Sequence, residues 1–409
     1  MNIIYINHYA GSPDMGMEFR PYYLAKEWIK MGHDVTIIAA DYSHLRRKNP
    51  EVKKDFQREI IDGVRYLWVK TKKYSGNGVN RAFTMYEFVH KIKKRAKWLS
   101  EVLRPDIVIT SSTYPLDTYA GQKIRKYSNA KLIHEVHDMW PESLIYLGGM
   151  KKNNPFVKLI QKGENSFCKK SDFIVSLLPN ADIRLVNHGM EKEKYIHIPN
   201  GVVLEEWSNP EDLPSEHKKV LEKIRKRGDF IICFFGSHTK SYNLEILIDT
   251  VEEIKNVSAV FIGSGIFKEE LKRKVGTLND KVYFLDPISK KSVPSLFKYI
   301  DATYISLKSD KLNRYGVAMN KLFDSMMGGK PIIFAASVPN DYVSKYNCGI
   351  TCIPEDLGEL KKAIRKLTSI SESDRNRMGE NGRRAVAEVF NYPKIAKKFE
   401  TVFMRGKNE

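Results

Sequence analysis

Residues 313–333 read NRYGVAMNKLFDSMMGGKPII, and the other segments of the chain can be placed around them. The spacing of apolar residues predicts a short helix, Lys321–Met327, which a pair of glycines ends. Residues 331–334 then read as the next buried strand. A loop that leads directly into a helix leaves backbone N–H groups free at the helix start, where the helix dipole favours an anion. The stretch therefore predicts an anion site at the start of this helix.

Three side chains in and after the loop indicate the kind of anion. Arg314 and Lys321 are cations that suit a phosphate group. Asp324 follows one turn into the helix, and its carboxylate can accept hydrogen bonds from both hydroxyls of a ribose. Cation, helix start and acid in this order predict a nucleotide diphosphate. An ordinary surface helix that stops at glycine would give the same pattern, so both interpretations stay open at this point.

The composition indicates a globular protein of two or three domains, because the chain has 409 residues, 42% of them hydrophobic and 29% charged. No apolar run is long enough to cross a membrane. The chain starts with a strand-like segment, residues 3–6, rather than a signal peptide, so we expect a cytoplasmic protein. Four scattered cysteines with no histidine cluster predict free thiols rather than a disulfide or a metal site.

The formal net charge of +19 is unevenly distributed, since residues 51–100 carry thirteen Lys/Arg and five Asp/Glu. Such a field attracts nucleic acid, anionic lipid or an anionic substrate, although it can also serve solubility alone. No zinc-finger spacing, RNA-binding signature or basic zipper is present, so we expect no nucleic-acid partner. Residues Tyr86–Leu103 predict a helix with one basic face, which suits an anionic membrane surface or is simply solvated.

The first forty residues predict a parallel sheet. A strand over residues 3–6 is followed by a loop with Gly11 and Gly16, a helix over residues 22–31 and a strand over residues 35–39. This order is a right-handed strand–helix–strand crossover, whose ligands bind at the carboxyl ends of the strands. The glycine spacing differs from the dinucleotide fingerprint, so we expect no nicotinamide or flavin cofactor.

The same pattern restarts after a polar segment, residues 205–228, which we interpret as a domain connection. The strand over residues 230–235 leads into a second glycine loop, and a helix is expected over residues 242–255. We therefore predict two α/β domains, residues 1–204 and 205–390, and a terminal helix within residues 391–409.

Four segments carry a resemblance to a known family. They are residues 16–25 together with 32–36, then 136–143 (VHDMWPES), 198–202 (IPNGV) and 320–331 (NKLFDSMMGGKP). The chain resembles retaining glycosyltransferases of family 4, and especially the bacterial members that build O-antigen and capsule repeat units. Each segment alone is a weak signal, but all four occur in the family's order, each at a strand end.

This resemblance implies the GT-B fold, in which two Rossmann-like domains face each other across a cleft and the last helix crosses back to the N-terminal domain. It implies transfer of a sugar from a UDP-sugar, an N-acetylhexosamine or a 6-deoxy relative, without a metal or other cofactor. The acceptor would be a saccharide, free or carried on a polyprenyl diphosphate, bound by the N-terminal domain. The protein would then work in the cytoplasm, at the inner face of the membrane.

The resemblance also assigns site residues by position. The residues expected at the reaction centre are His137, Asp138, Arg314 and Lys321. Those expected at the donor nucleotide are Gly16, Gly236, His238, Lys240, Ser264, Pro287, Asn320, Lys321 and Asp324. His137 would orient or polarise the sugar rather than attack it. A second interpretation of Asp138 is the N-cap of the helix that follows it.

The chain departs from the family pattern at the donor site. Gly316 stands where the family has an acid that contacts the donor sugar, so that contact is missing or comes from elsewhere. Ser237 and Tyr242 stand where an arginine and a lysine are frequent, and His238 and Lys240 are close enough in sequence to replace them.

Two other functions fit parts of the sequence. A sugar-nucleotide 2-epimerase uses the same fold without an acceptor, but it needs acid and base carboxylates that are not evident here. A non-enzymatic protein that binds nucleotides or polyanions would fit the charge and the missing acid at Gly316.

Overall fold

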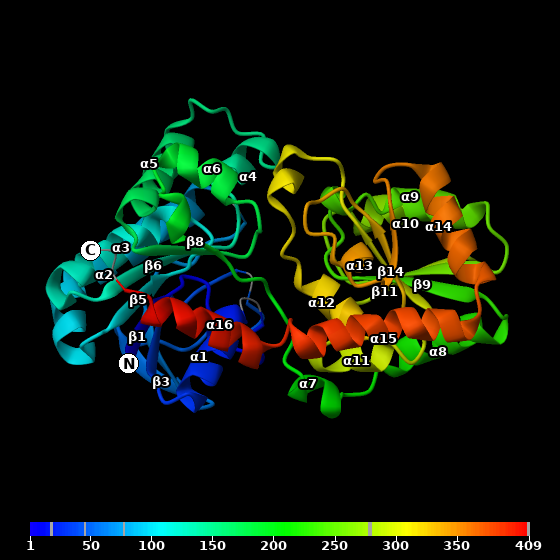
Figure 1. The fold of residues 1–409 in the computed structure, drawn as a ribbon. Helices are drawn as coiled ribbons and strands as arrows, with labels where there is room; N and C mark the ends of the chain where they lie inside the picture. The colour runs from blue at the N-terminus through cyan, green and yellow to red at the C-terminus, as the bar shows by residue number, and fades with distance from the viewer. Residues whose placement is uncertain (17–18, 45, 77, 277–279, 407–409) are drawn as a thin grey trace. The chain divides into compact units, whose positions relative to one another are not determined.

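The structure is a computed structural model that describes residues 1–16, 19–44, 46–76, 78–276 and 280–406. The chain forms two units (Figure 1). Unit 1 contains Met1–Asn200, Arg314–Ala318 and Tyr392–Glu409, and unit 2 contains Gly201–Asn313 and Met319–Asn391. Each unit is a largely parallel sheet with helices packed on it, which confirms the predicted pair of Rossmann-like domains.

The sheet of unit 1 has the strand order β3-β4-β2-β1-β5-β6-β7-β8. All neighbouring strands are parallel except β3, which pairs with β4 in the antiparallel sense. The strands are β1 (Asn2–Ile6), β2 (Asp34–Ala40), β3 (Gln57–Ile61), β4 (Val64–Val69), β5 (Ile107–Thr110), β6 (Lys131–Val136), β7 (Phe173–Ser176) and β8 (Tyr195–His197). The central strands are rich in isoleucine and valine and buried on both faces, as parallel sheets between helix layers are.

The helices of unit 1 cover both faces of this sheet. They are α1 (Arg20–Lys30), α2 (Val79–Leu103), α3 (Thr118–Ser128), α4 (Glu142–Tyr146), α5 (Pro155–Lys170), α6 (Asp182–Leu185) and α16 (Tyr392–Met404). Helix α2 starts seven residues before the predicted Tyr86, because Thr84 and Met85 are already buried in its first turns. Strand β3 was not predicted, since its three central residues are all exposed and its sequence carries no hydrophobic alternation.

The terminal helix α16 packs on α1. The indole Nε1 of Trp28 donates a hydrogen bond to the backbone oxygen of Ala396 at 3.1 Å. The Trp28 ring also contacts Phe399 and Phe403, with ring centroids 5.2 and 5.1 Å away. The helix starts at Tyr392, within the predicted range 391–409, and the proline that follows is compatible with a first helical turn.

The sheet of unit 2 is entirely parallel, with the order β11-β10-β9-β12-β13-β14. Its strands are β9 (Phe230–Phe235), β10 (Val257–Ile262), β11 (Val282–Leu285), β12 (Ala302–Ser306), β13 (Ile332–Ala335) and β14 (Gly349–Cys352). Its helices are α7 (Glu205–Ser208), α8 (Ser215–Lys226), α9 (Glu245–Glu252), α10 (Lys268–Val275), α11 (Val293–Leu296), α12 (Asn320–Met327), α13 (Tyr342–Lys345), α14 (Leu357–Ser369) and α15 (Glu372–Glu388).

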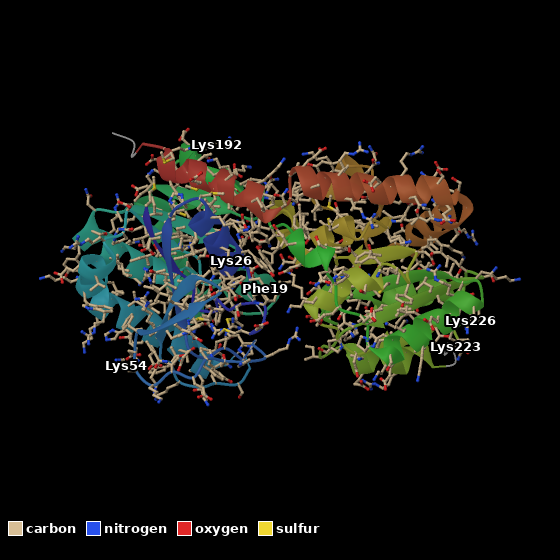
Figure 2. The ribbon with its side chains drawn as sticks, turned by 90° about the horizontal axis from the view of Figure 1, so that it is seen from below. Phe19, Lys26, Lys54, Lys192, Lys223 and Lys226 are labelled. Atoms are coloured by element: carbon tan, nitrogen blue, oxygen red, sulfur yellow. The ribbon has the colours of Figure 1, made fainter. Side chains whose placement is uncertain are left out.

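The segment 205–228 is not a domain connection, so that prediction was wrong. It forms α7 and α8, and the buried side chains of Leu221 and Ile224 pack into the core of unit 2. Lys223 and Lys226 point to solvent from the other face of α8 (Figure 2). The helix was not predicted, because its many charged residues outnumber the few apolar residues that pack on the core.

The helix expected over residues 242–255 is shorter than predicted. It starts at Glu245, because Lys240–Tyr242 form a 3-10 turn and Asn243 has a left-handed φ of +43°. None of the helices in the described ranges is both long enough and apolar enough to cross a membrane.

Candidate functional site

Two glycine loops meet at the carboxyl ends of β9 and β10 in unit 2. Gly263 has a φ of +146°, and a Cβ atom on it would lie 1.9 Å from the backbone oxygen of Gly236. Only glycine permits this approach. The loops border a cavity of about 250 Å³. Gly236, Ser264 and Pro287 line it, so the structure brings together three of the residues predicted to bind the donor nucleotide.

Lys321 lies in the first turn of α12, and its ammonium group is buried. Within the described ranges its Nζ atom has no hydrogen-bond partner. Nζ lies 3.6 Å from the ring centroid of Tyr242 and 4.2 Å from that of Phe234. Burial lowers the pKa of Lys321 to about 7. A buried ammonium without an anion is costly, so an anionic ligand here would be bound favourably.

Lys321 is also close to the glycine loop at the end of β9. A Cβ atom on Gly236 would lie 3.0 Å from Lys321 Nζ. The absence of that side chain leaves a ligand free to approach the ammonium group from the loop side. The start of α12 and the Gly236 loop therefore lie together around one buried ammonium group, and the anion site that the sequence predicts at Lys321 stays a prediction.

Asp324 lies one turn further along α12 and is half-buried. Burial raises the pKa of Asp324 to about 6, and the nearby carboxylate of Glu206 adds to this, while the charge of Lys290 opposes it. Asn320, at the start of the helix, is exposed. Both side chains lie on the helix that carries Lys321, and their contacts with a nucleotide stay predictions.

His238 occupies a position that the sequence did not suggest. Its imidazole is fully buried among the rings of Phe234, Phe261 and Phe284. Burial, with the charges of two lysines, lowers the pKa of His238 to about 4. Its backbone N–H donates to the backbone oxygen of Ser264 at 2.8 Å, which joins the two glycine loops. The side chain therefore supports the loops from within the core.

Lys240, by contrast, is exposed, with Nζ 5.3 Å from the ring centroid of Phe267. The predicted replacement of the family's missing cations by His238 and Lys240 stays a prediction. Of the two, only Lys240 presents its charged group to solvent in this structure.

Unit 1 contains a buried polar network centred on Glu135, at the carboxyl end of β6. Glu135 Oε2 accepts hydrogen bonds from Tyr5 Oη at 2.5 Å and Ser111 Oγ at 2.7 Å. His137 Nε2 lies 3.1 Å from the same oxygen and 2.8 Å from Ser111 Oγ. Arg20 Nε donates to Glu135 Oε1 at 2.9 Å. Four side chains, from β1, from the residues directly after β5 and β6, and from α1, therefore converge on one carboxylate.

The network fixes the charge of Glu135. Burial alone would favour the neutral acid, but the charge of Arg20 and the hydrogen bonds from His137 and Tyr5 outweigh it. Together they hold the pKa of Glu135 well below its usual range. Because an ionised carboxylate only accepts hydrogen bonds, the Nε2 atom of His137 carries the proton that it shares with Glu135.

Arg20 connects this network to the segment 198–202. Its guanidinium donates to the backbone oxygens of Ile198 and Pro199 and to Asn200 Oδ1, at 3.1, 2.8 and 3.2 Å. Three of the segments that carry the family resemblance thus meet around one buried arginine. Sequence reasoning missed Arg20 and Glu135 as members of the site. Arg20 stood within a recognised segment, but Glu135 reads as an ordinary residue of a buried strand.

Asp138 follows His137 and is exposed. It does not cap a helix, because α4 starts four residues later and its N-cap is Pro141, without a side-chain cap. The capping interpretation of Asp138 was therefore wrong. The role of Asp138 at the reaction centre stays a prediction.

Arg314 does not belong to the same unit as Lys321. The segment Arg314–Ala318 is part of unit 1, whereas Lys321 and Asp324 are part of unit 2, and the diphosphate site predicted for Arg314 together with Lys321 stays a prediction. Arg314 Nη2 lies 3.2 Å from Glu142 Oε1 and donates to Tyr315 Oη at 2.7 Å. In this structure Arg314 is thus paired with a carboxylate of α4.

Two glycines of the prediction have left-handed backbones. Gly16 has a φ of +71° and lies beside Arg47; the two residues that follow it lie outside the described residues. Gly316 is buried and has a φ of +103°. A residue with a side chain rarely adopts that conformation, so the acid expected from the family would be strained at this position.

Comparisons with known proteins agree with the fold. Residues 15–206 match the profile of Glycosyltransferase Family 4, and residues 216–385 match that of Glycosyl transferases group 1. The chain is 25% identical to "Uncharacterized glycosyltransferase MJ1069" of Methanocaldococcus jannaschii, over 73% of this chain and 75% of that protein. It is 21% identical to "Probable glycosyltransferase WbjE" of Pseudomonas aeruginosa, over 72% and 73% of the two chains.

Solved structures share the architecture at low identity. The sucrose-phosphate synthase of Thermosynechococcus elongatus superposes with a TM-score of 0.73 at 16% identity, over 98% of both chains. HepE of Anabaena, solved in complex with UDP and glucose, superposes with a TM-score of 0.66 at 14% identity, over 99% of this chain and 100% of that chain. Two glycosyltransferase profiles in the expected order, on two Rossmann-like units, lead to one conclusion: this chain is a glycosyltransferase of the GT-B type.

Proposed function

We propose that this glycosyltransferase is a retaining, metal-independent enzyme that transfers a sugar from a UDP-sugar to a saccharide acceptor, free or carried on a polyprenyl diphosphate. The sugar we propose is an N-acetylhexosamine or a 6-deoxy relative. The observation that carries the donor assignment is the buried, unpartnered ammonium group of Lys321 beside the Gly236 loop. The complex of the similarly folded HepE with UDP supports UDP as the nucleotide.

The chemistry at Lys321 follows from the charge that develops in the reaction. As the bond between the sugar C1 atom and the phosphate oxygen breaks, negative charge grows on the diphosphate. Lys321, whose Nζ atom is buried, and the N–H groups at the start of α12 would stabilise that charge. Loss of one such group typically lowers the rate by about 10²–10³-fold.

Retention requires the acceptor oxygen to bond to C1 on the face that the phosphate leaves. The departing phosphate can accept the proton of the acceptor hydroxyl, so no protein nucleophile is needed. His137, held by Glu135 and Ser111, would orient the sugar or the acceptor. An orienting role fits His137, because its Nε2 atom is already bonded to the Glu135 carboxylate and is not free to attack the sugar.

We propose the basic face of α2 as a contact with the anionic inner surface of the membrane. Lys93, Lys94, Arg95 and Lys97 are exposed on this helix, and Trp98 is exposed beside them. Cosedimentation with vesicles of anionic and of neutral lipid at low salt tests this contact. Reversal of Lys93, Lys94 and Arg95 to glutamate should abolish binding to the anionic vesicles; equal binding to neutral vesicles would contradict it.

Thermal-shift titrations with UDP, GDP, dTDP and CMP test the donor assignment. UDP at 100 times its dissociation constant should stabilise the protein by about 2.7 kcal/mol. Lys321→Ala should lose that response, whereas Lys298→Ala, an exposed lysine of unit 2, should keep it. A protein that responds to none of the nucleotides would contradict the donor site.

Product analysis tests the reaction. NMR of the product's anomeric proton distinguishes retention from inversion, and addition of EDTA tests independence from metal ions. Release of UDP from a UDP-sugar only when an acceptor is present is expected of a transferase. Interconversion of the UDP-sugar without an acceptor would instead indicate a 2-epimerase, and the comparisons do not favour that alternative.

A further inference from the structure

A groove on unit 1, separate from the Glu135 network, has no role so far. It lies beside α4, α5 and α6, which are neighbours in Figure 1, and has a volume of about 400 Å³. That volume is in the range of small-molecule binding sites. Its lining surface is mostly apolar, and the apolar side chains come from Pro141, Ile145, Tyr146 and Val157.

The groove also carries a cluster of cations. Lys152, Lys158 and Lys162 line it, and all three are exposed. Lys158 and Lys162 are one helical turn apart on α5, so they project from the same face. None of the three lysines forms an ion pair with a residue in the described part of the chain. The groove is thus an apolar surface bordered by uncompensated positive charge.

The one acid of the groove, Glu142, is not available to these lysines. Its Oε1 atom accepts a hydrogen bond from Arg184 at 3.0 Å and lies 3.2 Å from Arg314 Nη2. Arg184 is in turn bonded to Glu164 through both carboxylate oxygens, at 2.8 and 2.7 Å. The carboxylates at this end of the groove are therefore paired, and the potential over the lysines stays positive.

Further apolar side chains are exposed on the same three elements. Leu147 follows α4, Leu159 is on α5 and Ile183 is on α6, and each is exposed despite its size. None of the three lines the groove, so the apolar surface for an occupant is the floor of the groove itself. A purely ionic ligand would gain nothing from that floor.

We propose that this groove binds an isoprenyl chain that ends in a diphosphate, with the chain on the apolar floor and the diphosphate between Lys152, Lys158 and Lys162. Lysines suit a phosphate as point charges, and their aliphatic stems cover apolar surface. The occupant would be the lipid portion of the acceptor, and this assignment rests on the function proposed above. The groove would then position the acceptor by binding its isoprenyl diphosphate rather than its sugar.

The test uses the full-length protein and three probes: farnesyl diphosphate, farnesol and inorganic pyrophosphate. Isothermal titration at 0.15 M salt, where long-range attraction is screened, should show binding of farnesyl diphosphate. Pyrophosphate and farnesol should each bind about tenfold more weakly, because each lacks one half of the recognised group. Equal binding of pyrophosphate and farnesyl diphosphate would overturn the role of the apolar floor.

Matched double variants test the lysines. Lys158→Glu with Lys162→Glu should weaken binding of farnesyl diphosphate about tenfold. Lys169→Glu with Lys170→Glu makes the same change of charge on the same helix outside the groove, and should change binding less than about twofold. Equal weakening by both pairs would overturn the site, since it would show attraction by net charge alone.

The same preparations are titrated with UDP. A protein that binds UDP but not farnesyl diphosphate would refute the groove and leave the proposed function intact. A protein that binds neither would refute both. Light scattering of Ile145→Glu checks a second occupant: if the wild type is a dimer and this variant a monomer, the groove is an interface between copies and the proposal is wrong.

Discussion

His137 Nε2 lies 3.1 Å from Glu135 Oε2, inside a network that also contains the guanidinium of Arg20. The carboxylate stands between a permanent cation and the imidazole, so it serves both the stability of unit 1 and the orientation of His137. In the proposed function Glu135 would be a positioning residue, because it would act through His137 and not on the reacting atoms.

We expect Glu135→Gln to destabilise the protein, because it leaves the Arg20 charge buried without its partner. Breaking a buried ion pair in this way costs about 3–5 kcal/mol. Urea unfolding of the variant measures the loss, with Glu388→Gln, an exposed glutamate, as the control. In the fraction that stays folded, kcat should fall while KM for the donor changes little. An unchanged kcat would show that the network is purely structural.

The depressed pKa of Glu135 also gives a dependence on pH. A carboxylate whose pKa is lower in the folded state stabilises the protein above its ordinary pKa, about 4.3, and this contribution is lost as the pH falls below it. The free energy of unfolding of the wild type should therefore fall steeply in acid. Glu135→Gln should show a shallower fall, measured by urea unfolding between pH 3 and 7.

Lys321 predicts a second rise of stability with pH, in a higher pH window. Its folded pKa of about 7 lies below its unfolded value of about 10.5, so the unfolded chain binds more protons between these two values. Without ligand, stability should rise with pH in that window by up to about 1.4 kcal/mol per pH unit. Lys321→Met should remove this rise, and Lys298→Met should keep it.

Binding of UDP should respond in the reverse sense, because the diphosphate needs the protonated amine. Above pH 7 the dissociation constant for UDP should rise by up to about tenfold per pH unit. Titrations at pH 7, 8 and 9 measure it. A flat profile, the same in the wild type and in Lys321→Met, would exclude contact between this ammonium and the diphosphate.

Asp324 should distinguish a ribose from a deoxyribose. The wild type should bind UDP more tightly than 2′-deoxy-UDP, since the carboxylate accepts a hydrogen bond from the 2′-hydroxyl. A hydrogen bond to a charged group contributes about 1.5–3 kcal/mol. Asp324→Asn should lose much of that preference. Because the pKa of Asp324 is about 6, the preference should also weaken as the pH falls through 6.

Gly263→Ala tests the close approach of the two glycine loops. The new methyl group would lie 1.9 Å from the Gly236 oxygen, so the loops must separate. We expect a destabilisation of about 1–3 kcal/mol and a loss of UDP binding, measured by thermal shift. Gly78→Ala is the control, because a Cβ atom there meets nothing within 4 Å and its φ of −84° suits any residue. Equal effects of both substitutions would contradict the role of the approach.

The fold could be predicted from the sequence because both sheets are built from short runs of buried, β-branched residues separated by glycine loops and helices. The runs before Asn7 and Gly236 each mark the first strand of a unit, and the two parallel sheets follow from them. The secondary-structure predictions that were wrong concern single elements. Strand β3 has no hydrophobic alternation, and α8 carries so many charges that its two buried apolar residues, Leu221 and Ile224, gave no visible period.

The site could be predicted only in part, for a different reason. Gly236, Ser264 and Pro287 were assigned from the family resemblance. They line one cavity because each follows a strand, and parallel strands bring their carboxyl ends together. The burial of the His238 ring and the convergence of Arg20 on Glu135 depend on contacts between residues far apart in the chain. The spacing of residue types along the sequence does not predict such contacts. The pairing of Arg314 with Glu142, 172 residues away in the chain, is a further example.

The division of the chain into pieces has a consequence for the order in which it can fold during synthesis. Unit 1 includes α16 (Tyr392–Met404), and the indole of Trp28 has no partner for its N–H until Ala396 has been made. The last residue of unit 2 is Asn391, so on the ribosome that unit can be complete before unit 1 is. The N-terminal part of the chain must therefore wait, with the surface of α1 uncovered, and a truncation of a few C-terminal turns would damage the first-made domain rather than the last.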